Sequence, residues 1–227
     1  MKLIVFDIDG TLLNSTGVDE ECFQQALVDT FGIVSANFNW ENFSDVTDQG
    51  VTEDILAKHL GRTATETEVL KVELKMGELV QRERATNPFK FTPAPGVHDV
   101  IFELMKSKDT MFCLATGAWK DSALAKLSAL DVDLGGIPWA HAGPQRRRSD
   151  IVNEAVSRAK EYYQRADFSS IHALGDGKWD LLTAQELNLD FIGMDLLKTG
   201  RLVQLGAEKV IHEYSSLSDL KKLLSVT

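Results

Sequence analysis

The stretch that decides the fold is residues 3–11, which read LIVFDIDGT. Its first four residues are apolar, as expected of a central strand in a parallel sheet that is buried on both faces. The strand then stops abruptly at Asp7 and Asp9, which are followed by Gly10 and Thr11. Because chemistry in parallel sheets gathers at the carboxyl ends of the strands, this junction is the first candidate for a functional site.

The second half of the chain alternates between strand and helix patterns. Alternation of this length indicates parallel pairing with right-handed crossovers. The sequence therefore predicts an α/β fold, a Rossmann-like parallel sheet core with helices on both faces. Further strands are expected at 110–115, 137–140, 171–174, 190–194 and 209–212, and helices at 120–130, 149–165, 179–187 and 218–224.

Residues 15 to 90 have a different pattern, with helix signals and no comparable strand. Helices are expected at 20–31, at 52–60 with Thr52 as N-cap, and after Thr65, which forms a capping box with Glu68. We therefore expect a catalytic core of residues 1–14 and 91–227, with residues 15–90 inserted as an all-helical cap domain. This cap would form a lid over the end of the first strand.

Composition limits the classes of partner. The chain has 227 residues, an apolar share of 44% and a net charge of −10. The negative charge argues against nucleic acid and against an anionic membrane surface, because both bind clustered lysine and arginine. The N-terminus reaches a charge too early for a signal peptide, and no apolar run could span a bilayer, so we expect a cytoplasmic protein. No pattern in the sequence indicates an oligomeric state.

Asp7 and Asp9 are two residues apart on extended chain, so their carboxylates point to the same side. This pairing suggests a bound cation, or two pKa values pushed apart for acid–base work. A calcium-binding loop starting at Asp7 is excluded, because its required glycine and glutamate would fall on Leu12 and Val18. A solvated turn after the strand stays open as the alternative.

Other strand ends carry polar residues as well. Thr116 and Gly117 end the strand at 110–115 and could bind an anion, although Thr116 could equally cap a helix or lie in a turn. Arg146, Arg147 and Arg148 precede a helix, where cations oppose the helix dipole. At least one of them binds an anion, or all three are simply solvated.

A further acidic group follows the strand at 171–174. Gly175 and Asp176 end this strand, and Asp180 falls on the first turn of the next helix, where an acidic residue also suits the helix start. Together the strand ends supply a carboxylate nucleophile with a carboxylate neighbour, a hydroxyl, a guanidinium and a further acidic pair. This combination indicates phosphoryl transfer.

At this point the sequence resembles the haloacid dehalogenase-like hydrolases, in the subgroup with a helical cap after the first motif, and especially its phosphoglycolate-phosphatase-like members. The first motif corresponds to Asp7-Ile-Asp-Gly-Thr-Leu and the second to Thr116. The third corresponds to Arg148 or a neighbour, and the fourth to Gly175-Asp176 with Asp180. The third motif is most often a lysine in the family, so which of the three arginines, or Lys178, replaces it stays open.

The resemblance implies a mechanism. Asp7 would form an aspartyl-phosphate, and Asp9 would act as acid and then base. Mg²⁺ would be held by the carboxylates of Asp7 and Asp176 and by the backbone carbonyl of Asp9. Thr116, Gly117 and Arg148 or Arg147 would bind phosphate, and Asp180 would support the metal shell.

The remaining implied roles concern the turn after the first strand and the cap. Gly10 would let the chain turn away and Thr11 would fix that turn. Thr47 and Asp48 resemble a cap segment that helps to select substrate, although a polar loop at the lid edge is the alternative.

The expected function is a Mg²⁺-dependent phosphatase acting on a small phosphorylated metabolite. The near alternative is a phosphomutase, in which the same nucleophile returns the phosphoryl group to a sugar. A third reading is a relative that binds a phosphorylated metabolite without turnover, but the presence of both Asp7 and Asp9 argues against it. A dehalogenase is disfavoured, because Asp9 stands where that chemistry needs no second acid.

Overall fold

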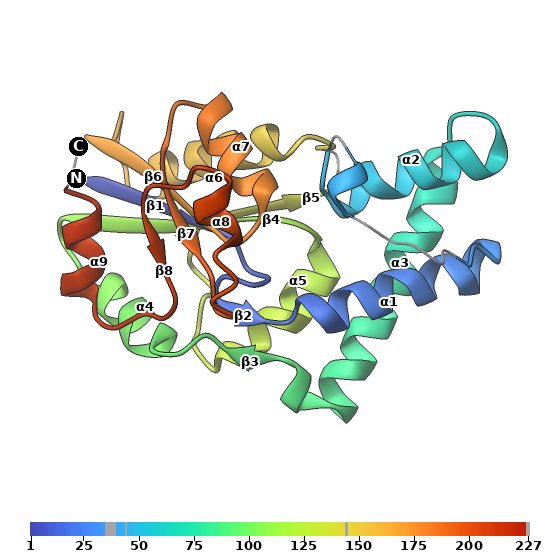
Figure 1. The fold of residues 1–227 in the computed structure, drawn as a ribbon, viewed down its shortest axis with the longest axis horizontal. Helices are drawn as coiled ribbons and strands as arrows, with labels where there is room; N and C mark the ends of the chain where they lie inside the picture. Colours follow the sequence, from blue (N-terminus) through green and yellow to red (C-terminus); the bar gives the residue numbers. More distant parts are fainter. Residues whose placement is uncertain (35–39, 44, 144, 226–227) are drawn as a thin grey trace.

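The computed structural model describes residues 1–34, 40–43, 45–143 and 145–225. Its centre is a six-stranded parallel sheet in the order β5-β4-β1-β6-β7-β8 (Figure 1). The predicted α/β fold is therefore confirmed. The strands are β1 (Lys2–Phe6), β4 (Thr110–Trp119), β5 (Trp139–Ala142), β6 (Ser170–Gly175), β7 (Asp190–Met194) and β8 (Val210–Ile211).

Both faces of the sheet are covered by helices, which explains the unbroken apolar run of β1. Leu3 and Val5 belong to the apolar cluster that contains Ile151 and Ala155 of α6, while Ile4 and Phe6 belong to the cluster of α4 and α9 on the other face. The helices around the sheet are α4 (Val97–Lys106), α5 (Lys120–Leu127), α6 (Arg148–Tyr162), α7 (Lys178–Glu186), α8 (Arg201–Gln204) and α9 (Leu217–Leu223), with a short 3₁₀ turn at Ser128–Leu130.

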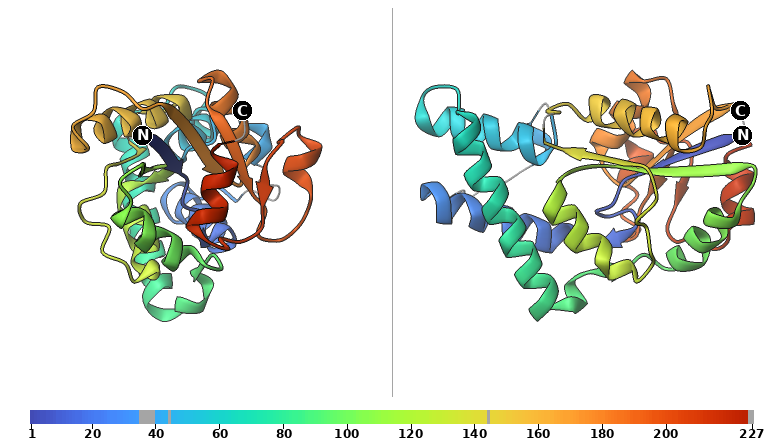
Figure 2. Two further views of the ribbon diagram at one scale, coloured as in Figure 1. Left: turned by 90° about the vertical axis from the view of Figure 1, so that its left-hand side faces the viewer. Right: turned by 180° about the vertical axis from the view of Figure 1, so that it is seen from behind.

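The helices between residues 16 and 86 lie beyond one end of the sheet, as two opposite views show (Figures 1 and 2). They are α1 (Thr16–Phe31), α2 (Asp48–Leu60) and α3 (Glu66–Thr86), with 3₁₀ turns at Trp40–Asn42 and Pro88–Lys90. The expected capping box of α3 is present, and its apolar stripe, including Val72 and Met76, is buried. The chain enters and leaves this segment through β2 (Leu13–Asn14) and β3 (Thr92–Pro93), which pair antiparallel.

Two helix starts differ by several residues from the sequence prediction, while α6, α7 and α9 each start one residue earlier than expected. The helix α2 begins at Asp48, and its N-cap is Thr47 instead of Thr52. The Thr47 hydroxyl accepts a hydrogen bond of 3.0 Å from the Gly50 N–H, while Thr52 is fully buried inside the helix. The helix α1 starts at Thr16, four residues before the expected position. Within the described residues, no helix combines the length and apolar character needed to cross a bilayer.

Candidate active site

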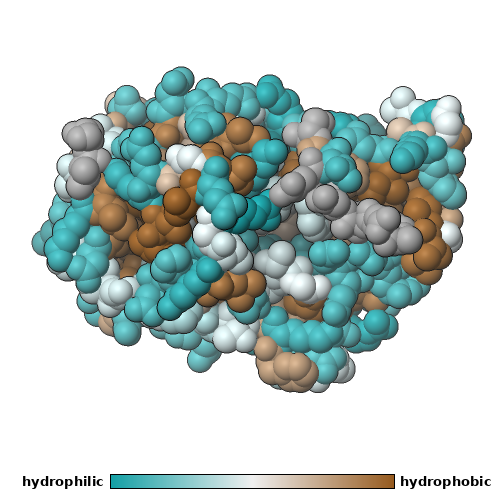
Figure 3. Space-filling view, viewed as in Figure 1, coloured by the Kyte–Doolittle hydropathy of each residue, from teal (hydrophilic) through white to brown (hydrophobic). Residues whose placement is uncertain are grey.

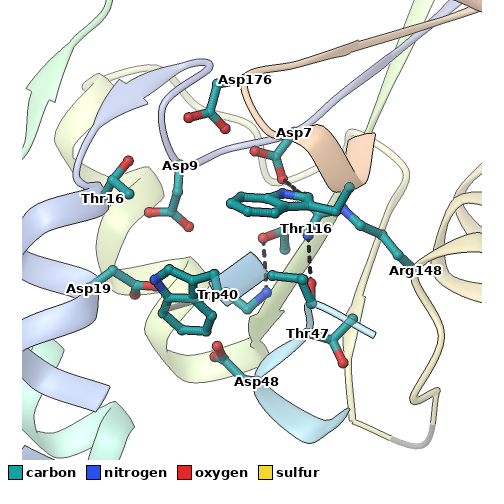
Figure 4. Close-up of a pocket in the computed structure, with 14 residues that line it drawn as sticks. Asp7, Asp9, Thr16, Asp19, Trp40, Thr47, Asp48, Thr116, Arg148 and Asp176 are labelled. Atoms are coloured by element: carbon teal, nitrogen blue, oxygen red, sulfur yellow. Dashed lines mark hydrogen bonds and ion pairs between the residues drawn. The ribbon is translucent and has the colours of Figure 1, made fainter. Parts of the chain in front are cut away.

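Residues near the carboxyl ends of three strands meet at one edge of the sheet, although β4 continues past the predicted end at residue 115 to Trp119, with an irregularity between Thr116 and Trp119. The strand β1 lies between β4 and β6, and its last residue, Phe6, is in register with Leu114 and Leu174. Asp7 follows β1, Thr116 lies in β4, and Asp176 follows β6, so their side chains reach one pocket between the sheet and the helices of residues 16–86 (Figure 4). The pocket is lined by Asp7, Asp9, Thr16, Asp19, Trp40, Val46, Thr47, Asp48, Thr116, Gly117, Ala118, Arg148, Asp176 and Trp179.

Asp7 is bound to Arg148, the first residue of α6. The Arg148 Nη2 donates to Asp7 Oδ1 at 2.6 Å, its Nε to Asp180 Oδ1 at 2.8 Å, and its Nη1 to the Val46 carbonyl at 3.0 Å. One guanidinium thus joins the end of β1, the start of α7 and the segment before α2. Burial lowers the pKa of Arg148, but Asp180 and Asp7 outweigh it and raise the value, so the side chain stays charged.

Carboxylates outnumber cations at this end of the pocket. Oxygens of Asp7, Asp176 and Asp180 all lie within 4.8 Å of one another. Burial and the neighbouring carboxylates raise the pKa values of Asp7 and Asp176 well above the ordinary range, although Arg148 lowers both. A divalent cation among these hard oxygen ligands would relieve the repulsion, so the residues fit the Mg²⁺ that the resemblance implies.

Gly10 leaves the room that this cluster needs. Its φ is +72°, a left-handed conformation that favours glycine, and a Cβ there would lie 2.0 Å from Asp176 Oδ2. The turn after β1 can therefore approach Asp176 only because residue 10 has no side chain.

Asp9 points away from the acidic cluster toward a buried lysine. Its Oδ1 accepts 2.6 Å from the Ser15 hydroxyl, and its Oδ2 accepts 2.6 Å from Lys126 Nζ. Lys126, on α5, is fully buried and also donates to Asp19 Oδ1 of α1 at 2.7 Å. Burial lowers the pKa of Lys126, but Asp19 and Asp9 raise it above its ordinary value. This lysine therefore joins Asp9 to the helical segment as a charged residue.

Sequence reasoning missed Lys126 and Asp19, although a signal exists for both. Lys126 stands among apolar residues of α5, next to Leu127, at a position that the helix buries. Asp19 lies beside Val18 on the buried face of α1. A charged residue at a position that helix periodicity assigns to the core needs a partner, and that requirement could have identified the pair.

Thr47 and Asp48 both reach the core from the start of α2. The Thr47 hydroxyl donates to the Arg146 carbonyl at 2.7 Å, and Asp48 Oδ2 accepts 2.9 Å from the Trp119 backbone N–H. Both side chains line the pocket. In Figure 4 Asp48, Asp19 and Trp40 lie at the opposite end of the view from Asp7 and Asp176.

This geometry can be compared with known proteins. The family model described as haloacid dehalogenase-like hydrolase matches residues 1–188. The chain belongs to the haloacid dehalogenase-like hydrolases. Membership of this hydrolase family agrees with the predicted phosphoric monoester hydrolase. Among curated proteins, none matches the sequence at a significant level.

Several solved structures have a similar fold, and three of them are described below with their sequence identity and coverage. A hydrolase from Pseudomonas syringae is 21% identical, with 100% of each chain covered and a TM-score of 0.74. A putative β-phosphoglucomutase from Bacteroides vulgatus is 18% identical over 99% of this chain and 89% of that one, with a TM-score of 0.70. A CbbY variant from Rhodobacter sphaeroides, in complex with xylulose-(1,5)bisphosphate, is 18% identical over 96% and 98%, with a TM-score of 0.71.

The haloacid dehalogenase-like motif residues of this chain mostly converge on the pocket. Thr116 Oγ1 accepts 3.1 Å from the Ala118 N–H, beside Gly117, and Thr11 Oγ1 lies 3.4 Å from Asp7 Oδ2. The Gly177 N–H donates to Asp180 Oδ2 at 2.9 Å. A Cβ on Gly175 would lie 2.4 Å from the Asp180 carboxyl group, so that position too is confined by the site.

Of the four cations considered for the third motif, Arg148 lies against Asp7. The Arg146 side chain pairs with three acids before and within α2, namely Asp45, Glu53 and Asp54. Arg147 is exposed and pairs with Glu186 at 2.6 Å. Lys178 lines a neighbouring hollow together with Arg147, and neither lines the pocket that holds Asp7.

Proposed function

We propose that this chain is a Mg²⁺-dependent phosphatase that hydrolyses a small phosphorylated metabolite through an aspartyl-phosphate on Asp7. The observation that carries the proposal is the surroundings of Asp7. It is buried just after β1, hydrogen-bonded to Arg148 and clustered with Asp176 and Asp180, and it lines a pocket. A carboxylate placed in this way is suited to attack phosphorus.

The first chemical step is assigned to Asp7 and Asp9. A carboxylate oxygen of Asp7 bonds to phosphorus while the bond to the ester oxygen breaks, and the departing oxygen takes a proton from Asp9. In the second step Asp9 takes a proton from water, whose oxygen attacks phosphorus and releases Asp7. Arg148 and the Thr116–Gly117 backbone bind the phosphate oxygens, where they stabilise the transferring group.

The Asp7 and Asp176 carboxylates and the Asp9 backbone carbonyl would hold Mg²⁺. When bound, the ion would offset the repulsion between the nucleophile and the phosphate, which amounts to roughly 4 kcal/mol for two unit charges about 4 Å apart at an effective dielectric near 20. Asp180 supports this end of the site by fixing Arg148 and the start of α7.

Residues 15–90 act in this proposal as a lid that excludes water and helps to select substrate. The support is that three side chains at the edge of the pocket bridge this segment and the core, namely Thr47, Asp48 and Arg148. In the space-filling view, hydrophilic and intermediate residues border the hollow between the two parts, while apolar patches lie to either side (Figure 3).

The proposal is tested by phosphate release from p-nitrophenyl phosphate, with Mg²⁺ and with chelator, beside the Asp7→Asn variant. We expect turnover that needs both the metal and Asp7. Turnover that persists in Asp7→Asn at the wild-type rate would refute the assignment of the nucleophile.

A phosphomutase is the second candidate, favoured by the similarity of fold to the putative β-phosphoglucomutase. A mutase would pass the phosphoryl group between Asp7 and a sugar. It would interconvert sugar phosphates in the presence of a sugar bisphosphate and release no net phosphate, so a phosphate balance distinguishes the two.

A further inference from the structure

Asp19 and Asp48 lie beside Trp40, in a part of the pocket that we call its outer half. Both are buried carboxylates, and each has one oxygen that accepts no hydrogen bond from a described residue. Asp48 is only 4% exposed and Asp19 only 9%, yet both line the pocket. Asp48 Oδ2 accepts the Trp119 N–H and Asp19 Oδ1 accepts Lys126, while the other oxygen of each has no hydrogen-bond partner among the described residues. Two hydrogen-bond acceptors therefore face the space beside Trp40 (Figure 4).

Few cations are available to a second anionic group in this space. Arg148 is the one cationic residue among the described residues that line the pocket, and its guanidinium is bonded at the phosphate end. Lys126 is fully buried between Asp9 and Asp19. The positions outside the described ranges contain no lysine or arginine.

Burial in the outer half of the pocket disfavours the ionised form of both carboxylates. Burial and the neighbouring Asp19 raise the pKa of Asp48 to about 8, although Lys126 and the Trp119 N–H lower it. Burial also raises the pKa of Asp19 to about 6, against the lowering by Lys126. Asp48 therefore holds a proton near neutral pH in the free protein, and a substrate ammonium group that displaces this proton leaves a carboxylate paired with a positive charge.

Building on the proposed phosphatase function, we propose that the substrate is a phosphate ester whose leaving group carries a hydroxyl or an ammonium group and no second anion. An ammonium donates to both Asp19 and Asp48, whereas a hydroxyl donates its one hydrogen to either of them, and the carbon skeleton lies beside Trp40. An ammonium gains attraction from the ionised Asp19, from Asp48 as it loses its proton, and from the indole face, while a carboxylate or second phosphate in the same place is repelled by Asp19.

Three phosphate esters with the same two-carbon chain test this preference, because they differ in the polar group at the end of that chain. They are 2-hydroxyethyl phosphate, 2-aminoethyl phosphate and carboxymethyl phosphate, with p-nitrophenyl phosphate as the common reference. We expect kcat/KM for the hydroxyl and amino esters to exceed that for the carboxymethyl ester by at least about tenfold. The same order of affinity is expected when the three bind to the Asp7→Asn variant in calorimetry.

The Asp48→Asn variant identifies the cause, because its amide oxygen can still accept the Trp119 N–H. The wild-type ratio of kcat/KM for the amino ester to that for the carboxymethyl ester is expected to be about tenfold or more. We expect this ratio to be smaller in the Asp48→Asn variant. Asp54→Asn, which makes the same substitution in the same helix outside the pocket, should leave the preference unchanged.

Carboxymethyl phosphate as the best substrate and tightest ligand would overturn the inference, as would an unchanged preference in Asp48→Asn. A preference for the anion that disappears in Lys178→Met would place the leaving group in the neighbouring hollow instead. Failure of the proposed function looks different: no ester, including p-nitrophenyl phosphate, would be hydrolysed, while the calorimetric order still tests the charge preference.

Discussion

Three arginines stand side by side before and at the start of α6, and their surroundings divide their roles. Arg148, whose side chain is only 11% exposed, reaches Asp7, Asp180 and the Val46 carbonyl, whereas Arg147 forms an exposed pair with Glu186. A fixed guanidinium fork can hold a phosphate and its nucleophile together, while an exposed pair contributes little to stability.

We therefore predict that Arg148→Ala lowers kcat/KM by about 10²-fold or more, because a preorganised donor to the transferring group is lost. Arg147→Ala should retain wild-type activity within about twofold and change the free energy of unfolding by less than about 1 kcal/mol. Steady-state kinetics on p-nitrophenyl phosphate and urea unfolding check both. Equal losses of activity in the two variants would contradict the assignment.

Lys126 is a positioning residue for Asp9. With Ser15 it occupies both carboxylate oxygens of Asp9, and through Asp19 it ties that carboxylate to α1. Removal of Lys126 leaves two carboxylates without their buried cation, which typically costs about 3–5 kcal/mol.

We predict that Lys126→Met lowers the free energy of unfolding by about 3–5 kcal/mol and lowers kcat more than it changes KM. The loss of kcat should be larger for an alkyl phosphate than for p-nitrophenyl phosphate, because a poor leaving group depends more on the proton that Asp9 supplies. Lys126→Arg is the conservative comparison and should recover part of the loss. An equal loss for both substrates would indicate a purely structural lysine.

The sequence predicted the position of a single site residue well where that polar residue follows an apolar run. Asp7, Thr116 and Asp176 could be placed at one edge because parallel strands end at the same edge. Lys126 and Asp19 could not be paired, because they come from helices 107 positions apart that meet only when the segment of residues 15–90 folds back on the core. Arg148 could not be separated from Arg146 and Arg147, since that choice depends on which way each side chain leaves the first turn of α6.

At the scale of elements, α2 depends on a cap that also binds the core. Thr47 accepts the Gly50 N–H and donates to the Arg146 carbonyl, so one hydroxyl starts the helix and joins it to the segment before α6. Thr65 caps α3 in the same way but is exposed and remote from the pocket.

We predict that Thr47→Ala and Thr65→Ala each lower the free energy of unfolding by about 1 kcal/mol, because each loses an N-cap. Only Thr47→Ala should also raise KM, since only this threonine holds the edge of the pocket. Urea unfolding and kinetics on the same protein samples separate the two effects. A raised KM in Thr65→Ala as well would mean that general loosening of the helices, and not the edge contact, controls substrate binding.

The true start of α2 was hidden by its glycine. Gly50 lies in the first turn of α2, at a position where glycine weakens a helix pattern. In the structure a Cβ at residue 50 would lie 2.9 Å from the Asp45 carbonyl, so tight packing of the preceding segment requires glycine in the first turn. The strand pattern, in contrast, predicted β7 with the right bounds, because Ile192 and Met194 are apolar residues that the sheet buries.

At the scale of the whole molecule, buried acids make stability depend on pH. The pKa of Asp48 is raised from 3.8 to about 8, and that of Asp19 from 3.8 to about 6. Between pH 3.8 and the raised pKa of each group, the folded protein binds more protons than the unfolded chain. The contribution of these two groups to the free energy of unfolding therefore falls as pH rises. Asp7 and Asp176 are raised in the same direction.

We predict that, in chelator, the free energy of unfolding falls as pH rises through the window between 3.8 and about 8, and that Asp48→Asn makes this slope shallower near the upper end. Urea unfolding at several pH values measures the slope. The control is Asp54→Asn, whose carboxylate lies outside the pocket and which should keep the wild-type slope. A stability that rises with pH across this window would contradict the burial of these carboxylates.

The proposed mechanism requires Asp7 to accept the phosphoryl group. Its most direct test is rapid quench of the Asp9→Asn variant with p-nitrophenyl phosphate and Mg²⁺, followed by mass spectrometry of the peptide that carries Asp7. Because hydrolysis of the intermediate is assigned to Asp9, we predict that this peptide gains the mass of one phosphoryl group, and that the gain disappears when Asp7 is also replaced by asparagine. Phosphate released with no phosphoryl group on Asp7 at any time point, or a phosphoryl group on another residue, would contradict the account.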